Sequence, residues 1–135
     1  MNDKEIRIII AGSRDYSDYE ELCKATDKIL QTHVFSKETF KKSDIVIVCG
    51  MARGADLLGK RYAESKGYNV KFFPANWDLY GKSAGYIRNE EMAKYASYRN
   101  GYGALIAFWD GKSRGTKHMI NLAKKYNLKV FLPMK

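Results

Sequence analysis

The sequence predicts an α/β fold: a single open, doubly wound domain in which about five mostly parallel strands carry helices on both faces. Short β-branched and apolar runs alternate along the chain with longer segments of helical spacing, an order typical of parallel sheets with right-handed crossovers. The run Ile45–Cys49 is apolar throughout, which indicates a strand buried on both faces. A chain of 135 residues is long enough for one core, so we expect residues 1–135 to form one domain.

The first strand is predicted at Lys4–Ala11, a segment rich in isoleucine. A helix is expected to begin near Ser17, because Ser17 and Glu20 have the spacing of a capping box. One apolar face with helical spacing continues from there to about Gln31. Residues 32–43 are mixed and polar, and we expect a loop there with a short helical turn.

Two strands and a helix are predicted in the middle of the chain. The second strand is Ile45–Cys49, and a helix is expected from Ala55 to Gly67, where glycine can adopt the left-handed conformation that ends many helices. The third strand is predicted at Val70–Phe73. Residues 75–82 are expected to form a long irregular connection.

A further helix, strand, helix and strand complete the predicted order. Helical spacing resumes between Ile87 and Ala96, and Ala104–Trp109 is predicted to be a buried fourth strand. A polar glycine loop at 110–116 opens the last helix, and Leu128–Leu132 is the fifth strand.

Polar turns follow four of the predicted strands. The carboxyl ends of parallel strands meet at one edge of a sheet, so we expect these turns to lie together, where ligands of this architecture bind. Helices that begin in such turns direct free N–H groups and partial positive charge at the same edge, which favours an anion such as phosphate. The turns are Gly12–Arg14, Gly50–Asp56, Ala75–Trp77 and Asp110–Thr116.

Arginine and hydroxyl side chains in and near these turns can donate hydrogen bonds to an anion. The planar guanidinium fork matches phosphate, and hydroxyl groups beside helix N-termini add further donors. These side chains are Arg14, Arg53, Arg88, Arg114, Ser13, Ser113 and Thr116.

Three other residues fit more than one role. Asp56 either accepts a hydrogen bond from a ribose hydroxyl or only stabilises the N-terminus of its helix. Trp77 either stacks on a base or packs against the protein. Trp109 closes a buried strand, which favours packing.

Two standard cofactor motifs are excluded. Gly54, Gly59 and Lys60 have the spacing of a phosphate-binding P-loop, but Arg61 replaces the serine or threonine that would hold Mg²⁺. No dinucleotide fingerprint follows Gly12. We therefore expect neither a standard ATPase nor a nicotinamide dehydrogenase, and no bound cofactor.

The cysteines and histidines do not have metal-ligand spacing, so no metal site is expected, and both cysteines are expected to be reduced core residues.

The formal net charge of +9 favours anionic partners, but it does not choose between nucleic acid, a nucleotide and solubility alone. No apolar run approaches the roughly 20 residues of a spanning helix, and the first residues lack the form of a signal peptide. A cytoplasmic protein without membrane contact is expected.

Four motifs in order resemble the YspA-related branch of the SLOG superfamily. This Rossmann-like group also contains the LOG cytokinin-activating phosphoribohydrolases and the DNA-processing protein DprA. The resemblance implies a nucleotide or nucleotide-derived ligand at the carboxyl edge of the sheet, and it makes a homodimer plausible. The motifs lie at residues 8–14, 50–56, 87–92 and 108–116.

The resemblance also assigns family positions to individual residues. Gly12, Ser13 and Arg14 match the first glycine turn of the family, and Arg88 begins its Arg-x-x-x-Met element, which here includes Asn89 and ends at Met92. The second glycine turn is matched by Gly50, Gly54 and Asp56, and the phosphate loop by Gly111, Gly115 and Thr116.

The phosphate loop departs from the family pattern in two ways. The second glycine of Gly-Gly-x-Gly-Thr is replaced by Lys112 or Ser113, depending on the alignment. The hydrolases carry a catalytic glutamate three residues after the threonine of this loop, where this chain has Met119. Hydrolysis through that glutamate is therefore not expected.

Three functional hypotheses follow. The leading one is binding of a nucleotide-derived ligand, of ADP-ribose or signalling-nucleotide type, by a sensor or sequestering protein. The second is hydrolysis of the N-glycosidic bond of a nucleoside monophosphate, with Arg88 in the site and Asp110, Glu90 or Glu91 in place of the missing acid; Asp110 is the best placed of these.

The third hypothesis is nucleic-acid binding. Tyrosines interleaved with basic residues suit a surface that stacks bases and contacts phosphates, although a basic surface with structural tyrosines explains the same pattern. The tyrosines are Tyr80, Tyr86, Tyr95, Tyr98 and Tyr102, and the basic residues are Lys82, Arg88, Lys94 and Arg99.

Overall fold

A computed structural model of the chain describes residues 5–37, 39–99 and 102–134. Five strands form one sheet in the order β3-β2-β1-β4-β5, and every neighbouring pair is parallel. The predicted open parallel sheet is therefore confirmed. The strands are β1 (Ile6–Gly12), β2 (Ile45–Cys49), β3 (Asn69–Phe72), β4 (Gly103–Phe108) and β5 (Lys129–Phe131).

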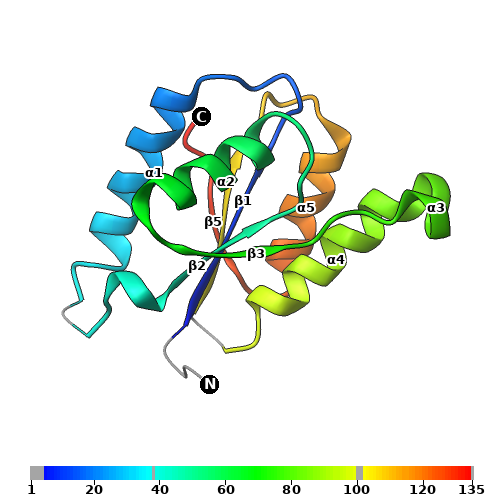
Figure 1. Cartoon of the computed structure of the whole chain (residues 1–135). Coiled ribbons are helices and arrows are strands. Elements are labelled where there is room, and N and C mark those ends of the chain that lie inside the picture. Colours follow the sequence, from blue (N-terminus) through cyan, green and yellow to red (C-terminus); the bar gives the residue numbers. More distant parts are fainter. Residues whose placement is uncertain (1–4, 38, 100–101, 135) are drawn as a thin grey trace.

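Helices cover both faces of the sheet, as predicted (Figure 1). One layer contains α1 (Tyr19–His33) and α2 (Ala55–Lys66), and the opposite layer contains α4 (Ala84–Ala96) and α5 (Arg114–Lys125). None of these helices, which lie within the described part of the chain, is long and apolar enough to cross a membrane.

The central strand β1 supplies both halves of the core. Ile8 and Ile10 point to the layer of α1 and α2, whereas Ile9 and Ala11 point to the layer of α4 and α5. The three isoleucines are at most 2% exposed, and each stabilises the fold by roughly 1.5–3 kcal/mol through burial of its side chain. The predictions that β2 is buried on both faces and that β4 is buried are correct, and β1 is also largely buried.

The ends of several elements differ from the prediction by one or two residues; β4, for example, is Gly103–Phe108 and not Ala104–Trp109. The helix α1 starts at Tyr19, because the carboxylate of Asp18 accepts a hydrogen bond from the Glu21 amide at 2.9 Å and caps the helix, so the predicted capping box from Ser17 is wrong. The third strand begins one residue earlier than predicted, at Asn69. It is an edge strand whose side chains are largely exposed.

The connection predicted to be irregular contains a single-turn helix, α3 (Trp77–Tyr80). Asn76 caps it by accepting a hydrogen bond from the Leu79 amide at 3.1 Å, a role that the sequence analysis did not assign. A 3₁₀ turn at Gly81–Ser83 joins α3 to α4. A second 3₁₀ turn, Lys42–Asp44, overlaps the end of residues 32–43, where a loop with a short helical turn was expected, but the first two of these residues belong to α1.

Backbones approach closely where β1 and β4 end side by side. A Cβ atom on Gly12 would lie 2.5 Å from the carbonyl oxygen of Phe108 and 2.7 Å from the Cβ of Ala55. The Ser13 amide also donates to the same Phe108 oxygen at 3.1 Å. The chain leaves β1 toward one edge of the sheet and later returns to β4 on the other side, so this is the switch point at which doubly wound sheets open a crevice.

Replacement of Gly12 by alanine is expected to lower the free energy of unfolding by about 2 kcal/mol, because the added methyl group would overlap backbone of β4. Chemical denaturation measures the change. The matched control is Gly115→Ala, since no atom lies within 4 Å of the added Cβ there. Equal stability of the two variants would contradict the close approach at Gly12.

Candidate functional site

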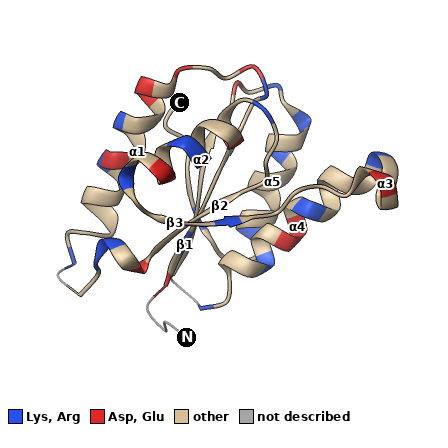
Figure 2. Cartoon of the chain, in the orientation of Figure 1, with Lys and Arg blue, Asp and Glu red and all other residues tan. Residues whose placement is uncertain are grey.

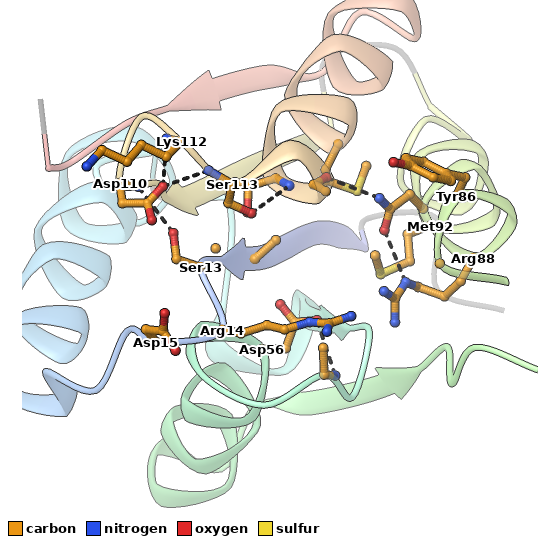
Figure 3. A pocket seen from close by; sticks show the side chains of 18 of the residues that line it. Ser13, Arg14, Asp15, Asp56, Tyr86, Arg88, Met92, Asp110, Lys112 and Ser113 are labelled. Carbon is orange, nitrogen blue, oxygen red and sulfur yellow. Dashed lines mark hydrogen bonds between the residues drawn. The ribbon is translucent and has the colours of Figure 1, made fainter. Parts of the chain in front are cut away.

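A cleft of about 520 Å³ lies at the carboxyl edge of the sheet, within the roughly 300–1,000 Å³ typical of small-molecule sites. Its walls come from the turns after β1 and β4 and from the first half of α4 (Figure 3). Most of the predicted site residues line it: Gly12, Ser13, Arg14, Asp56, Trp77, Arg88, Asn89, Asp110, Ser113, Gly115 and Thr116.

Five predicted residues lie elsewhere. Arg114 is exposed at the start of α5 and is not among the described residues that line the cleft. Gly50 and Arg53 line a neighbouring hollow, described below. Gly54 has φ +81°, and a Cβ on it would lie 2.4 Å from the Ser13 carbonyl oxygen. Gly111 has φ +83° in the turn after β4. Neither Gly54 nor Gly111 is among the described residues that line the two hollows, so their observed part is to shape the turns.

The N-terminus of α5 opens into the cleft. Ser113 caps it, and its Oγ accepts a hydrogen bond from the Thr116 amide at 3.3 Å and lies 3.0 Å from the Thr116 hydroxyl oxygen. Gly115 has no atom within 4 Å of the position of a Cβ, so a ligand can approach this first turn closely. The positive end of a helix of 12 residues therefore faces the cleft.

Asp110 orders the loop before α5. Its Oδ1 accepts hydrogen bonds from the amides of Lys112 and Ser113, both at 2.8 Å, and its own amide donates to Ser13 Oγ at 3.2 Å (Figure 3). These amide donors, Ser113 first, lower the pKa of Asp110. Asp110 is thus a fixed carboxylate that links the turns after β1 and β4, which makes it a poor proton donor.

Arg88 and Asp56 place opposite charges at the base of the cleft. Arg88 is 9% exposed; its guanidinium donates to the Gly50 carbonyl oxygen and, from Nε, to Asn89 Oδ1 at 3.0 Å. Asp56 is 5% exposed and accepts a hydrogen bond from the Ala52 amide at 3.4 Å. Burial raises the pKa of Asp56 to about 7, although Arg88 opposes the change.

Arg14 completes this charge group. It is exposed, and it has no hydrogen bond or ion pair with another residue in the described part of the chain. Figure 3 shows its side chain reaching over Asp56 toward the side of the cleft where Arg88 lies. Two guanidinium groups thus share one buried carboxylate, which leaves an excess of positive charge for an anionic ligand.

Asn89 connects α4 to α5. Its Nδ2 donates to the Gly115 carbonyl oxygen at 3.3 Å and lies 3.2 Å from Nδ1 of His118. The Tyr86 ring meets the His118 ring edge-on, with centroids 4.6 Å apart. Burial lowers the pKa of His118, which favours the neutral ring that can accept this hydrogen bond. Sequence reasoning missed the cluster because its members are on two helices that are distant in sequence.

Other residues of the cleft were also missed. Asp15 directly follows the predicted turn Gly12–Arg14, and Lys112 lies inside the predicted turn Asp110–Thr116, so their positions at strand ends could have indicated them. Lys82 and Tyr86 were named only for the nucleic-acid hypothesis, and it is the path of α3 and α4 that brings them to the cleft. Neither Glu90 nor Glu91 is among its described lining residues; Glu90 instead accepts a hydrogen bond from Tyr126 Oη at 3.0 Å.

A second hollow, of about 580 Å³, adjoins the cleft on the side of β2 and β3. It contains Gly50 and Arg53, and the turn between them passes through Met51, whose φ is +63°. The two hollows share Arg14, Ala52, Trp77 and Arg88.

The tyrosines of the nucleic-acid hypothesis do not lie together. Tyr95 and Tyr98 hold the guanidinium of Arg7 between their rings, at 3.8 and 3.6 Å from the centroids. Tyr98 also donates to the Glu5 carbonyl oxygen, just before β1. These contacts are at the amino edge of the sheet, opposite the cleft that Tyr86 lines.

Within the described ranges, no group of three or more His, Cys, Asp or Glu side chains could hold a metal ion. Cys49 is buried, as expected, and burial raises the pKa of its thiol to about 12. Cys23, the other free cysteine, is half-buried beside the core.

Comparisons with known proteins agree with this architecture. A family model described as "YspA, cpYpsA-related SLOG family" matches residues 6–80. The Gene 61 protein of Mycobacterium phage D29 is 33% identical over 129 residues, covering 92% of this chain and 93% of that protein. The X-ray structure of DNA processing protein A (DprA) from Streptococcus pneumoniae matches with a TM-score of 0.64 at 18% identity. That match covers 95% of this chain and 50% of the DprA chain, and it shows a shared fold.

The raised pKa of Asp56 predicts a pH-dependent stability. Between about pH 4 and pH 7 the unfolded chain loses this proton while the folded protein keeps it, so the free energy of unfolding falls as the pH rises. The total loss from this group is about 4 kcal/mol at most. Urea denaturation from pH 4.5 to 7.5 measures the free energy of unfolding of Asp56→Asn and of the unchanged protein. As the pH rises, the stability of the variant relative to the unchanged protein should increase. A constant difference would contradict the raised pKa.

Proposed function

The chain belongs to the YspA, cpYpsA-related SLOG family, and on this premise we propose that it binds a nucleotide or nucleotide-derived ligand in the cleft at the switch point. The observation that carries the proposal is the convergence of the α5 N-terminus with Arg14 and Arg88 on one cleft. A helix N-terminus and paired arginines are what a phosphate group requires.

The phosphate is proposed to lie between the first turn of α5 and Arg14. Gly115 leaves room for close approach, and the Thr116 hydroxyl, which is 4% exposed, lies in the same turn. The guanidinium of Arg14 makes no hydrogen bond or ion pair among the described residues, so its donors are available to a ligand. Burial is the main cause of the lowered pKa of Arg88, and the charge of Arg14 adds to it. Binding of an anion there offsets this repulsion between the two arginines.

Aromatic side chains at the mouth of the cleft supply the complementary apolar contact. Trp77 and Tyr86 line it and are 52% and 48% exposed, much more than packed rings. A base stacked on such a ring gains roughly 1–3 kcal/mol. This supports a ligand with both a phosphate and a heterocycle, and it favours the stacking role for Trp77 over packing.

Nucleic-acid binding is the weaker alternative. The basic residues are not gathered in one stripe, since Lys and Arg lie on the helices of both layers (Figure 2). The tyrosines that would stack bases are divided between the two edges of the sheet.

Isothermal titration with AMP tests the proposed site. Arg14→Ala is expected to weaken binding roughly tenfold or more, because it removes a charge-assisted hydrogen bond to phosphate. The matched control is Arg61→Ala on α2, an exposed arginine that stacks on Tyr19 away from the cleft. Equal affinities of the two variants would reject the site, and no binding across a panel of nucleotides would reject the function.

A second candidate function is N-glycosidic hydrolysis, with Asp56 as the acid in place of Asp110. Asp56 lines the cleft, and its pKa of about 7 suits proton transfer near neutral pH. Arg88 then serves to hold the sugar phosphate near this carboxyl group. The sequence analysis favoured Asp110, but its lowered pKa argues against an acid role.

Release of free base from nucleoside monophosphates, followed by chromatography, tests this candidate. If hydrolysis occurs, Asp56→Asn should lower its rate at least 100-fold, as expected for loss of a general acid. Glu91→Gln, which removes an exposed carboxylate of α4 outside the cleft, should not change the rate. Hydrolysis retained in Asp56→Asn would exclude Asp56 as the acid.

A further inference from the structure

The cleft and the second hollow form one elongated site. We call the region between them, which is lined by the residues that both share, the divide. The cleft, of about 520 Å³, lies over β1 and β4, and the second hollow, of about 580 Å³, lies toward β2 and β3. Arg14, Ala52, Trp77 and Arg88 line both. Each hollow alone is large enough for one small-molecule group, so together they have room for a ligand with two such groups.

The two hollows differ in charge. The cleft contains the carboxylates of Asp15, Asp56 and Asp110 along with its basic residues. The described lining of the second hollow contains three arginines and no acidic residue: Arg14, Arg53 and Arg88. Positive charge therefore increases from the cleft across the divide, where two of the three arginines lie.

We propose that the ligand has two sugar-bearing halves joined by a pyrophosphate. The nucleoside half lies in the cleft, the pyrophosphate extends from the first turn of α5 and Arg14 to Arg88 at the divide, and the second half lies against Arg53. This inference rests on the proposed function and narrows its ligand class. Neither mononucleotides nor free sugar phosphates fill both hollows.

The chemistry of the divide matches a pyrophosphate. Arg14 has no hydrogen-bond partner among the described residues, and Arg88 uses only part of its donor set, on Gly50 and Asn89. Asp56 balances only one of the two guanidinium charges. Two linked phosphates supply enough acceptors for both forks at once, and guanidinium groups bind such oxygens in a bidentate manner.

The depth of Arg88 favours a small molecule over a nucleic-acid strand. Only 9% of this residue is exposed, and its guanidinium is held at the level of the Gly50 carbonyl at the end of β2. The phosphates of a strand that crosses the surface would meet Arg14 and Arg53, which are exposed, but they would not reach Arg88. A compact pyrophosphate can enter the divide.

Titration calorimetry with ADP-ribose, AMP and ribose 5-phosphate tests the inference on the full chain. ADP-ribose is expected to bind at least tenfold more tightly than AMP, since it gains the contacts of the divide and the second hollow. In Arg53→Ala the ratio of the ADP-ribose and AMP affinities should fall toward one. Arg61→Ala, which removes an exposed arginine outside both hollows, should leave the ratio unchanged.

The outcomes separate this inference from the proposed function. AMP binding without a preference for ADP-ribose, or a preference that Arg53→Ala does not alter, overturns the two-part ligand and leaves the nucleotide site intact. If neither nucleotide binds, both proposals fail. A short single-stranded oligonucleotide that binds more tightly than ADP-ribose, with an affinity that Arg53→Ala weakens, also overturns the inference and favours a nucleic-acid strand in the same groove.

Discussion

The carboxyl edge of the sheet depends on the close contact of three backbone segments that have no side chains between them. Gly12 lies against the end of β4, and Gly54 lies against the carbonyl groups of Ser13 and Arg14. The Ala55 amide adds a hydrogen bond to the Ser13 carbonyl oxygen at 3.3 Å. The turn after β1 is thereby held from both sides. Ser13 and Arg14, which project from this turn, consequently have fixed positions relative to the first turns of α2 and α5.

Charge at the base of the site is retained at an energetic cost. A buried carboxylate and a buried guanidinium lose hydration that their mutual attraction only partly restores, and Asp56 and Arg88 show this in the directions of their pKa shifts. Well-packed apolar residues would serve the fold at least as well. Strongly perturbed ionisable groups in a cleft are more typical of functional sites than of structural ones, so this pair agrees with a ligand site more than with a purely structural role.

The sequence was sufficient to predict the sheet, because an uninterrupted apolar run such as Ile45–Cys49 has few alternatives to a buried strand in a chain of this length. It also located the polar turns, since strand ends in a parallel sheet converge by geometry. The predicted start of α1 was wrong. Ser17 and Asp18 are both residues that cap helices well, and only the path of the chain determines that Asp18 is the cap. The contact of Asn89 with His118 and the arrival of Lys82 and Tyr86 at the cleft depend on how helices pack, which no local pattern encodes.

Among the α-helices of the described residues, only the single-turn helix α3 has no buried residue. In Figure 1 it projects beyond the layer of α4 and α5, and a helix this short is not stable on its own. Local opening of such a segment costs little free energy, whereas opening of the buried central strands approaches global unfolding. Amide hydrogens of α3 are therefore expected to exchange with solvent far faster than those of β1. Trp77 lies on α3, whereas Arg88 is buried on the 13-residue helix α4, so we expect the two sides of the same site to fluctuate on different timescales.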